Sequence, residues 1–133
     1  MPTIRGFFEV KVIPQTDGPE AGAPAIGRFL LDKKYHGALE APSHGQMIAH
    51  RTAEKTSAGY TALEVVTGIL DGKQGSFVLQ HSGTMDRGAE KLDLHVIADS
   101  GTGELVGLRG DMKIIREGGR HEYEFTYQLE PTN

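Results

Sequence analysis

The sequence predicts an all-β protein: an antiparallel meander of eight strands that closes into a barrel. Glycine accounts for 18 of the 133 residues, nearly twice the average usage of about 7%. It divides the chain into stretches mostly shorter than the mean α-helix of about 11–12 residues. Several of these stretches alternate apolar and polar residues with the period of a half-buried strand. Turn-forming residues separate them, as expected for hairpins.

The two ends of the chain provide the first and eighth predicted strands. In the N-terminal segment, one face carries Phe8, Val10 and Val12, and the other carries Phe7, Glu9 and Lys11. The C-terminal stretch His121–Glu130 alternates most regularly, with Tyr123, Phe125, Tyr127 and Leu129 on a single face. Both patterns are typical of strands with one buried face.

Six further strands are predicted between these ends, at Arg28–His36, Gln46–Thr52, Tyr60–Leu70, Ser76–Met85, Lys91–Ala98 and Met112–Arg116. Hairpin turns are predicted at Asp71-Gly72-Lys73, Asp86-Arg87-Gly88 and Gly118-Gly119. Three segments are expected to be irregular. Pro14–Pro24 is a long loop, Ser100–Gly110 is a glycine-rich crossing with one short helical turn, and Thr52–Ser57 is a candidate for another helical turn.

We expect residues 1–133 to form a single β-barrel domain. Closure into a barrel hides the strand edges of such a meander. An eight-stranded barrel leaves an interior that side chains fill or that holds one small ligand. A two-sheet β-sandwich is the alternative, because periodicity alone does not separate the two architectures.

The strand at Tyr60–Leu70 is apolar on both faces, with Leu63, Val65 and Ile69 on one and Tyr60, Val66 and Leu70 on the other. Strands of this kind are expected to be covered on both sides. In a single-layer barrel the outer cover comes from loops, from the N-terminal segment or from another subunit. We therefore expect a homo-oligomer, with a dimer favoured, and loop cover within a monomer as the alternative.

Composition and charge exclude several classes of function. The chain has 14 basic and 18 acidic residues and a net charge of −4, whereas a nucleic-acid binder is expected to be basic. The absence of cysteine excludes disulfides, thiolate metal sites and cysteine nucleophiles. No stretch approaches the roughly 18 apolar residues of a membrane span. The N-terminal segment alternates and carries charge, unlike a signal peptide, so we expect a cytoplasmic protein.

No motif for a nucleotide or metal cofactor is recognisable, and we expect none. The segment Gly101–Gly107 resembles a dinucleotide fingerprint, but Val106 occupies the place of the third glycine. We expect its glycines to allow the positive φ angles and close backbone contacts that a tight crossing of the chain requires. The six histidines contain no His-x-His or His-Glu-x-x-His spacing, and no Gly-x-Ser-x-Gly elbow is present.

His81 and Glu64 are candidate catalytic residues. His81 shares a strand face with Phe77 and Leu79, so its buried imidazole requires a polar partner. Glu64 lies in the neighbouring strand at a similar height, and the register decides whether the two side chains share a face. A buried carboxylate beside an imidazole suits proton transfer. A structural pair that fixes strand register, or an interface contact, is the alternative.

A second set of candidates is aromatic and is expected to face the barrel interior: Phe8, Tyr60, Tyr123, Phe125 and Tyr127. Such a stripe usually packs a core, and its alternative role is to bind a ligand in a cavity. Tyrosines suit a cavity wall because their hydroxyls require a polar partner or water.

Three ordered segments, Leu63–Gly68, Gly75–Thr84 and Ser100–Gly110, resemble an uncharacterised bacterial family of unknown function. Its members carry LERxTG, GSFVLQHxGT and GTGEL.GLRG in this order, and the resemblance extends over roughly residues 4 to 130. Val65 stands where the family pattern has arginine. Because members of that family resemble allene oxide cyclase and dirigent proteins, the resemblance implies a calycin-like eight-stranded antiparallel barrel. It implies no activity, since fold does not determine function.

The sequence is therefore compatible with three functions. The first is a barrel that binds a small apolar molecule in an aromatic cavity. The second is an isomerase or cyclase that uses Glu64 and His81 for acid–base chemistry. The third is a structural oligomer without a ligand.

Overall fold

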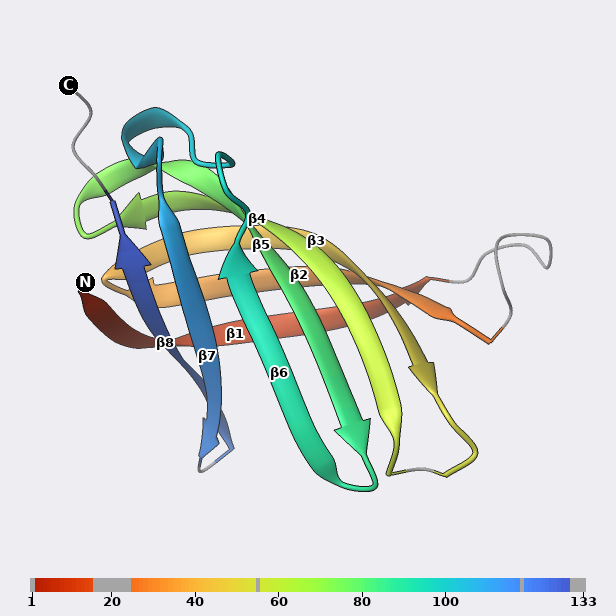
Figure 1. Ribbon diagram of the computed structural model, residues 1–133. Helices are drawn as coiled ribbons and strands as arrows, with labels where there is room; N and C mark the ends of the chain where they lie inside the picture. The colour runs from red at the N-terminus through yellow and green to blue at the C-terminus, as the bar shows by residue number, and fades with distance from the viewer. Residues whose placement is uncertain (1, 16–24, 55, 118, 130–133) are drawn as a thin grey trace.

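The protein is described here by a computed structural model that covers residues 2–15, 25–54, 56–117 and 119–129. Its eight strands pair antiparallel in sequence order and close into a barrel (Figure 1), as predicted. The elements are β1 (Thr3–Gln15), β2 (Gly27–Gly37), β3 (Leu39–Arg51), β4 (Ala58–Leu70), β5 (Lys73–Asp86), β6 (Ala89–Val96), the 3₁₀ turn η1 (Gly103–Leu105), β7 (Arg109–Glu117) and β8 (Arg120–Gln128). No helix among the described residues is long and apolar enough to cross a membrane.

Pairing of the first and last strands closes the barrel and excludes the sandwich alternative. Gly6 of β1 pairs with Gly37 of β2 on one side and with Tyr123 of β8 on the other. The tight hairpins follow local turn chemistry. Asp71 and Gly72 have φ of 47° and 81°, and Arg87 and Gly88 have φ of 47° and 89°. Two successive residues with positive φ form the turn whose twist matches that of the flanking strands.

Strand β3 differs most from the prediction, because it begins at Leu39 instead of Gln46. Pro42 and Gly45 interrupt the local strand pattern, but pairing with β2 and β4 holds this segment extended. Long-range pairing therefore outweighs local propensity here.

Two of the segments predicted to be irregular also differ. Pro14 and Gln15 belong to β1, and the remaining residues of the predicted loop lie outside the described ranges. The described part of Thr52–Ser57 is a hydrogen-bonded turn without helix, in which the Ser57 amide donates to the Glu54 carbonyl at 2.9 Å. Gly118 of the predicted last turn is also outside the described residues.

The segment between β6 and β7 covers the upper end of the barrel in Figure 1 and contains the predicted short helical turn, η1. Leu105 and Leu108 from this segment are fully buried. Gly103 has φ of +61°, and a Cβ there would lie 2.8 Å from the Gln74 carbonyl oxygen. The glycine-rich segment therefore serves close packing against β5, as predicted for its backbone.

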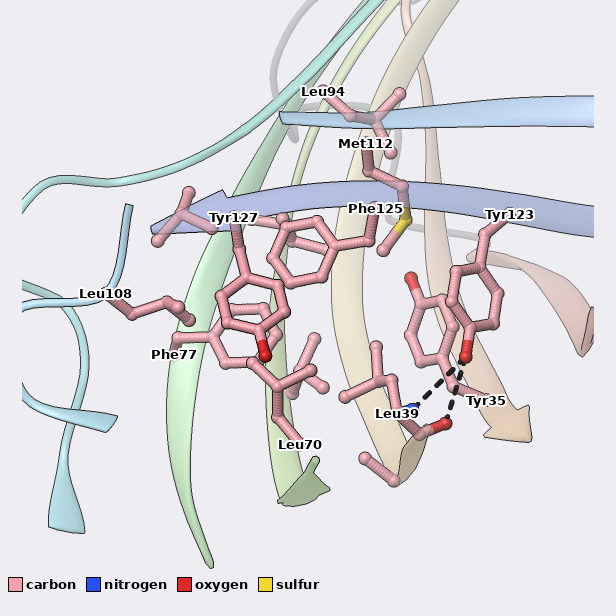
Figure 2. Close-up of a cluster of buried hydrophobic side chains, with 14 of the residues drawn as sticks. Tyr35, Leu39, Leu70, Phe77, Leu94, Leu108, Met112, Tyr123, Phe125 and Tyr127 are labelled. Carbon is pink, nitrogen blue, oxygen red and sulfur yellow. Dashed lines mark hydrogen bonds between the residues drawn. The ribbon is translucent and has the colours of Figure 1, made fainter. Parts of the chain in front are cut away.

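Beneath this cover the interior is filled by aromatic and aliphatic side chains (Figure 2). The rings of Phe77 and Phe125 stack with their centroids 5.9 Å apart, and Tyr127 stacks on Phe125 at 5.6 Å. The Tyr123 hydroxyl donates to the His36 carbonyl at 3.0 Å and accepts from the Leu39 amide at 3.3 Å. This half of the barrel is a dense core with its polar groups paired.

Candidate functional site

A buried polar cluster lies in the barrel interior beside this core. We define it by five residues from four adjacent strands: Lys33, Tyr35, Ser43, Glu64 and His81. Side chains of a strand alternate between the two faces, so the register determines which of them meet. Lys33 pairs with Ser43, Gly45 with Glu64, and Ala62 with His81. Glu64 and His81 therefore share the inner face.

Glu64 is the centre of the cluster and is fully buried. Its Oε1 accepts hydrogen bonds from the Tyr35 hydroxyl and, at 3.0 Å, from Ser43 Oγ. Its Oε2 accepts from Lys33 Nζ at 2.8 Å. A buried carboxylate is tolerated only with such compensation, because desolvation of an unpaired charge is very costly.

His81 contacts the same carboxylate, with Nε2 2.6 Å from Glu64 Oε2. The buried Nε2 has no well-aligned hydrogen-bond partner among the described residues. The contact joins the His81 ring directly to the carboxylate at the centre of the cluster.

The cluster holds Glu64 ionised and Tyr35 protonated. Burial alone raises the pKa of Glu64, but the contact with His81 and the charge of Lys33 outweigh it and lower the pKa to about 2. Burial, followed by the nearby Glu64 carboxylate, raises the pKa of Tyr35 well above its ordinary value. Tyr35 is therefore a hydrogen-bond donor and Glu64 an acceptor at neutral pH.

Lys33 contributes more than its charge. Its ammonium lies 5.0 Å from the centre of the Phe8 ring and 5.6 Å from that of Tyr35. Such cation–π contacts favour a desolvated cation. They help to explain how a lysine that is only 6% exposed is accommodated inside the barrel.

The opposite end of the barrel contains an open cavity of about 480 Å³. Its wall is formed by the first residues of β2, β4 and β6 and the last residues of β3, β5 and β7. The ends of β4 to β7 lie at the bottom of Figure 1, and β2 begins at its right. The apolar part includes Phe29, Met47, Ala49, Met85 and Leu92. Charged side chains also line it: Arg51, Glu90, Lys91 and Arg116.

Tyr60 connects this cavity to the buried polar cluster. Its ring lines the cavity and meets the His81 ring edge-on, with the centroids 6.4 Å apart. A Cβ at Gly83 would lie 2.3 Å from the Tyr60 ring, so a glycine is required beneath it. The ring therefore packs directly on the strand that carries His81.

The five predicted aromatic residues separate into two groups. Tyr60 lines the cavity. Phe8, Tyr123, Phe125 and Tyr127 belong to the buried core and do not line this cavity, because the closed half of the barrel leaves no space beside them. The Tyr127 hydroxyl donates to Asp71.

Three cluster residues were not among the predicted site residues. Lys33 and Tyr35 share the inner face of β2 with Leu31, so a charged residue at a core position was a detectable signal. Ser43 lies in the half of β3 that local pattern did not identify. Arg116 belongs to the predicted seventh strand, but only closure of the barrel shows that it reaches the cavity.

No group of three or more His, Asp or Glu side chains that could hold a metal ion is found among the described residues.

Comparison with known proteins gives one family. The model of a family described as "Protein of unknown function (DUF3224)" matches residues 4–127. A crystal structure of a DUF3224-family protein of unknown function from Shewanella oneidensis MR-1 is similar, with 48% sequence identity and a TM-score of 0.91. The alignment covers 99% of each chain. No curated protein matches.

Proposed function

This chain belongs to the DUF3224 family of proteins of unknown function, and we propose from the geometry of its barrel that it binds a small, mostly apolar molecule. The observation that carries the proposal is the cavity of about 480 Å³ at the open end. Ligand pockets typically have about 300–1,000 Å³ and combine an apolar wall with a few polar groups.

The contrast between the two halves of the interior supports this proposal. The upper half is packed with Phe77, Phe125 and the leucines of the η1 segment. At the open end the small residues Ala49 and Ala58 leave the space unfilled. Because protein interiors are normally close-packed, a large apolar hollow favours an occupant.

Binding can be tested with the neutral fluorophore N-phenyl-1-naphthylamine, whose emission rises in apolar surroundings. We expect wild type to bind it and Ala49→Trp, which fills the cavity, to bind at least 10-fold more weakly. Ala98→Trp is the matched control. Ala98 is exposed, and it follows the C-terminal end of β6, whereas the cavity lies at the N-terminal end of that strand. Equal binding by both variants, or no binding by wild type, would contradict the proposal, and the latter would favour a structural oligomer without a ligand.

Proton-transfer catalysis by an isomerase or cyclase is a second candidate, and the buried contact between Glu64 and His81 favours it. The cluster combines a carboxylate, an imidazole, a phenol donor and an ammonium in a dry environment, where acid–base groups are most strongly tuned. Glu64 is sealed from solvent, and Tyr60, which lines the cavity, packs against the His81 ring of the cluster.

This second function is tested by deuterium incorporation into unsaturated carboxylic acids incubated with the protein in D₂O, read by mass spectrometry. Wild type should incorporate deuterium, and Glu64→Gln and His81→Ala should abolish it while retaining the barrel by circular dichroism. His44→Ala is the control, because His44 pairs with Asp32 at 3.6 Å on the outer face. If the acids remain unlabelled with wild type, or if both variants retain labelling, the catalytic role is wrong.

A further inference from the structure

The cavity mouth is positively charged although the chain is negatively charged. Of the described side chains in its wall, three are basic, Arg51, Lys91 and Arg116, and one is acidic, Glu90. The chain as a whole carries a net charge of −4. A patch of opposite sign at the entrance of an apolar cavity raises the local concentration of an anionic ligand.

Within the described residues, these three cations have no acidic partner. Among the described side chains, no carboxylate lies within 4.0 Å of Arg51, Lys91 or Arg116. Basic residues elsewhere on the surface do have partners, such as Arg5 with Glu124 at 2.9 Å and Lys34 with Glu40 at 3.3 Å. The guanidinium groups at the mouth are therefore available for a ligand.

Arg116 lies on the face of β7 that forms part of the cavity wall. It follows Met112 and Ile114 on the inward face of β7. Burial raises the pKa of Tyr60 and the positive charge of Arg116 opposes that rise, so the guanidinium is close enough to act on the phenol. A guanidinium and a phenol hydroxyl are both donors to an anionic oxygen.

We propose that the molecule bound in the cavity is an amphipathic carboxylic acid, which places its apolar body against Phe29, Met47 and Met85 and its carboxylate at Arg116 and Arg51. This inference rests on the proposed binding function and specifies its ligand class. Arginine is suited to this role, because its planar guanidinium binds a carboxylate through two parallel hydrogen bonds.

The experiment compares two competitors of equal chain length, decanoate and decan-1-ol, for displacement of N-phenyl-1-naphthylamine at pH 8. With wild type, decanoate should displace the fluorophore at about a 10-fold lower concentration, as expected for one charge-assisted contact. Arg116→Gln should remove this preference by weakening decanoate alone, and Arg51→Gln should reduce it. Arg109→Gln is the control, since Arg109 lies at the opposite end of β7 and does not line the cavity.

The outcomes separate this inference from the function on which it rests. If decanol displaces the fluorophore as well as decanoate does, or if Arg116→Gln leaves the preference unchanged, the carboxylate assignment is wrong and the apolar site stands. If the neutral fluorophore itself does not bind to wild type, the binding function fails. Raising the salt concentration should weaken decanoate and leave decanol unaffected, because only the charged contact is screened.

Discussion

Glu64 gives the protein a specific acid sensitivity. Its pKa in the folded protein is about 2, below its ordinary value of 4.5. The unfolded chain therefore takes up a proton at this group before the folded chain does, and protonation favours unfolding. This contribution to the free energy of unfolding is complete above about pH 4.5 and is lost as the pH falls toward 2.

We expect this loss to amount to about 3 kcal/mol, since one pKa unit corresponds to about 1.36 kcal/mol. Urea unfolding of wild type and Glu64→Gln between pH 7 and pH 2.5 measures it, and the variant should lose less stability on acidification. Direct ¹³C NMR titration of the Glu64 carboxyl provides a check that does not depend on how the variant folds. A carboxyl resonance that titrates near pH 4.5 would refute the prediction.

At the level of single residues, the sequence indicated where polar groups enter the core but not how they combine. His81 was recognisable because its neighbours on the same face are Phe77 and Leu79. The contact with Glu64 depends on the β4–β5 register, in which Ala62 lies opposite His81. A slip of one residue would have placed Glu64 on the outer face, and periodicity alone does not fix that choice.

At the level of elements, the meeting of β6 and β7 divides the closed end from the open end. These strands pair only at Leu94–Met112 and His95–Asp111, and they diverge below that point in Figure 1. Leu92 and Arg116, which lie beyond the paired residues, both line the cavity. Above them, the η1 segment covers the core.

We predict that this cover stabilises the barrel without forming part of the ligand site. Leu105→Ala removes a fully buried side chain from η1 and should lower the free energy of unfolding by about 2–5 kcal/mol. Val106→Ala in the next position is the matched control, because Val106 is 49% exposed and its loss should cost under about 0.5 kcal/mol. Urea unfolding gives both values. Equal stability of the two variants would show that the segment is dispensable, and loss of fluorophore binding by folded Leu105→Ala would place it in the site.

Turns and strands could be predicted where the residues that determine them are neighbours in the sequence. The hairpins at Asp71-Gly72-Lys73 and Asp86-Arg87-Gly88 were identified because Asp and Gly are turn-forming residues, and Gly72 and Gly88 adopt the positive φ that glycine permits. The first half of β3 was missed because Pro42 and Gly45 disguise a strand that only its neighbours on both sides stabilise. Local chemistry therefore predicts turns better than it predicts strands held by distant partners.

At the scale of the whole molecule, the outer surface of the barrel carries an apolar patch. We define this outer patch by residues of β1 to β4 that point away from the interior and are each 42–51% exposed: Ile13, Leu30, Ile48, Leu63, Val65 and Ile69. All of these residues except Ile69 line a hollow of about 730 Å³, together with the polar residues Asp32, His44 and Gln46. Exposed apolar patches with polar residues around them are typical of interaction surfaces.

We propose that a second copy of the chain covers the outer patch and forms a homodimer. The patch lies on a continuous antiparallel sheet, and two such sheets pack face to face at about 10 Å with their side chains interdigitated. A two-fold axis brings the same patch of each copy together, which is the commonest symmetry of soluble oligomers. Light scattering after size exclusion should therefore give twice the 14.4 kDa of one chain.

Leu63→Glu combined with Val65→Glu should convert this dimer to a monomer, because each copy would bury two unpaired carboxylates. Val106→Glu is the control for an exposed apolar residue outside the patch, and it should remain dimeric. The cavity opens at the end of the barrel and not on this outer face, so the monomeric variant should still bind N-phenyl-1-naphthylamine. A wild-type mass of 14.4 kDa, or a double variant that stays dimeric, would show that the outer patch does not join two copies.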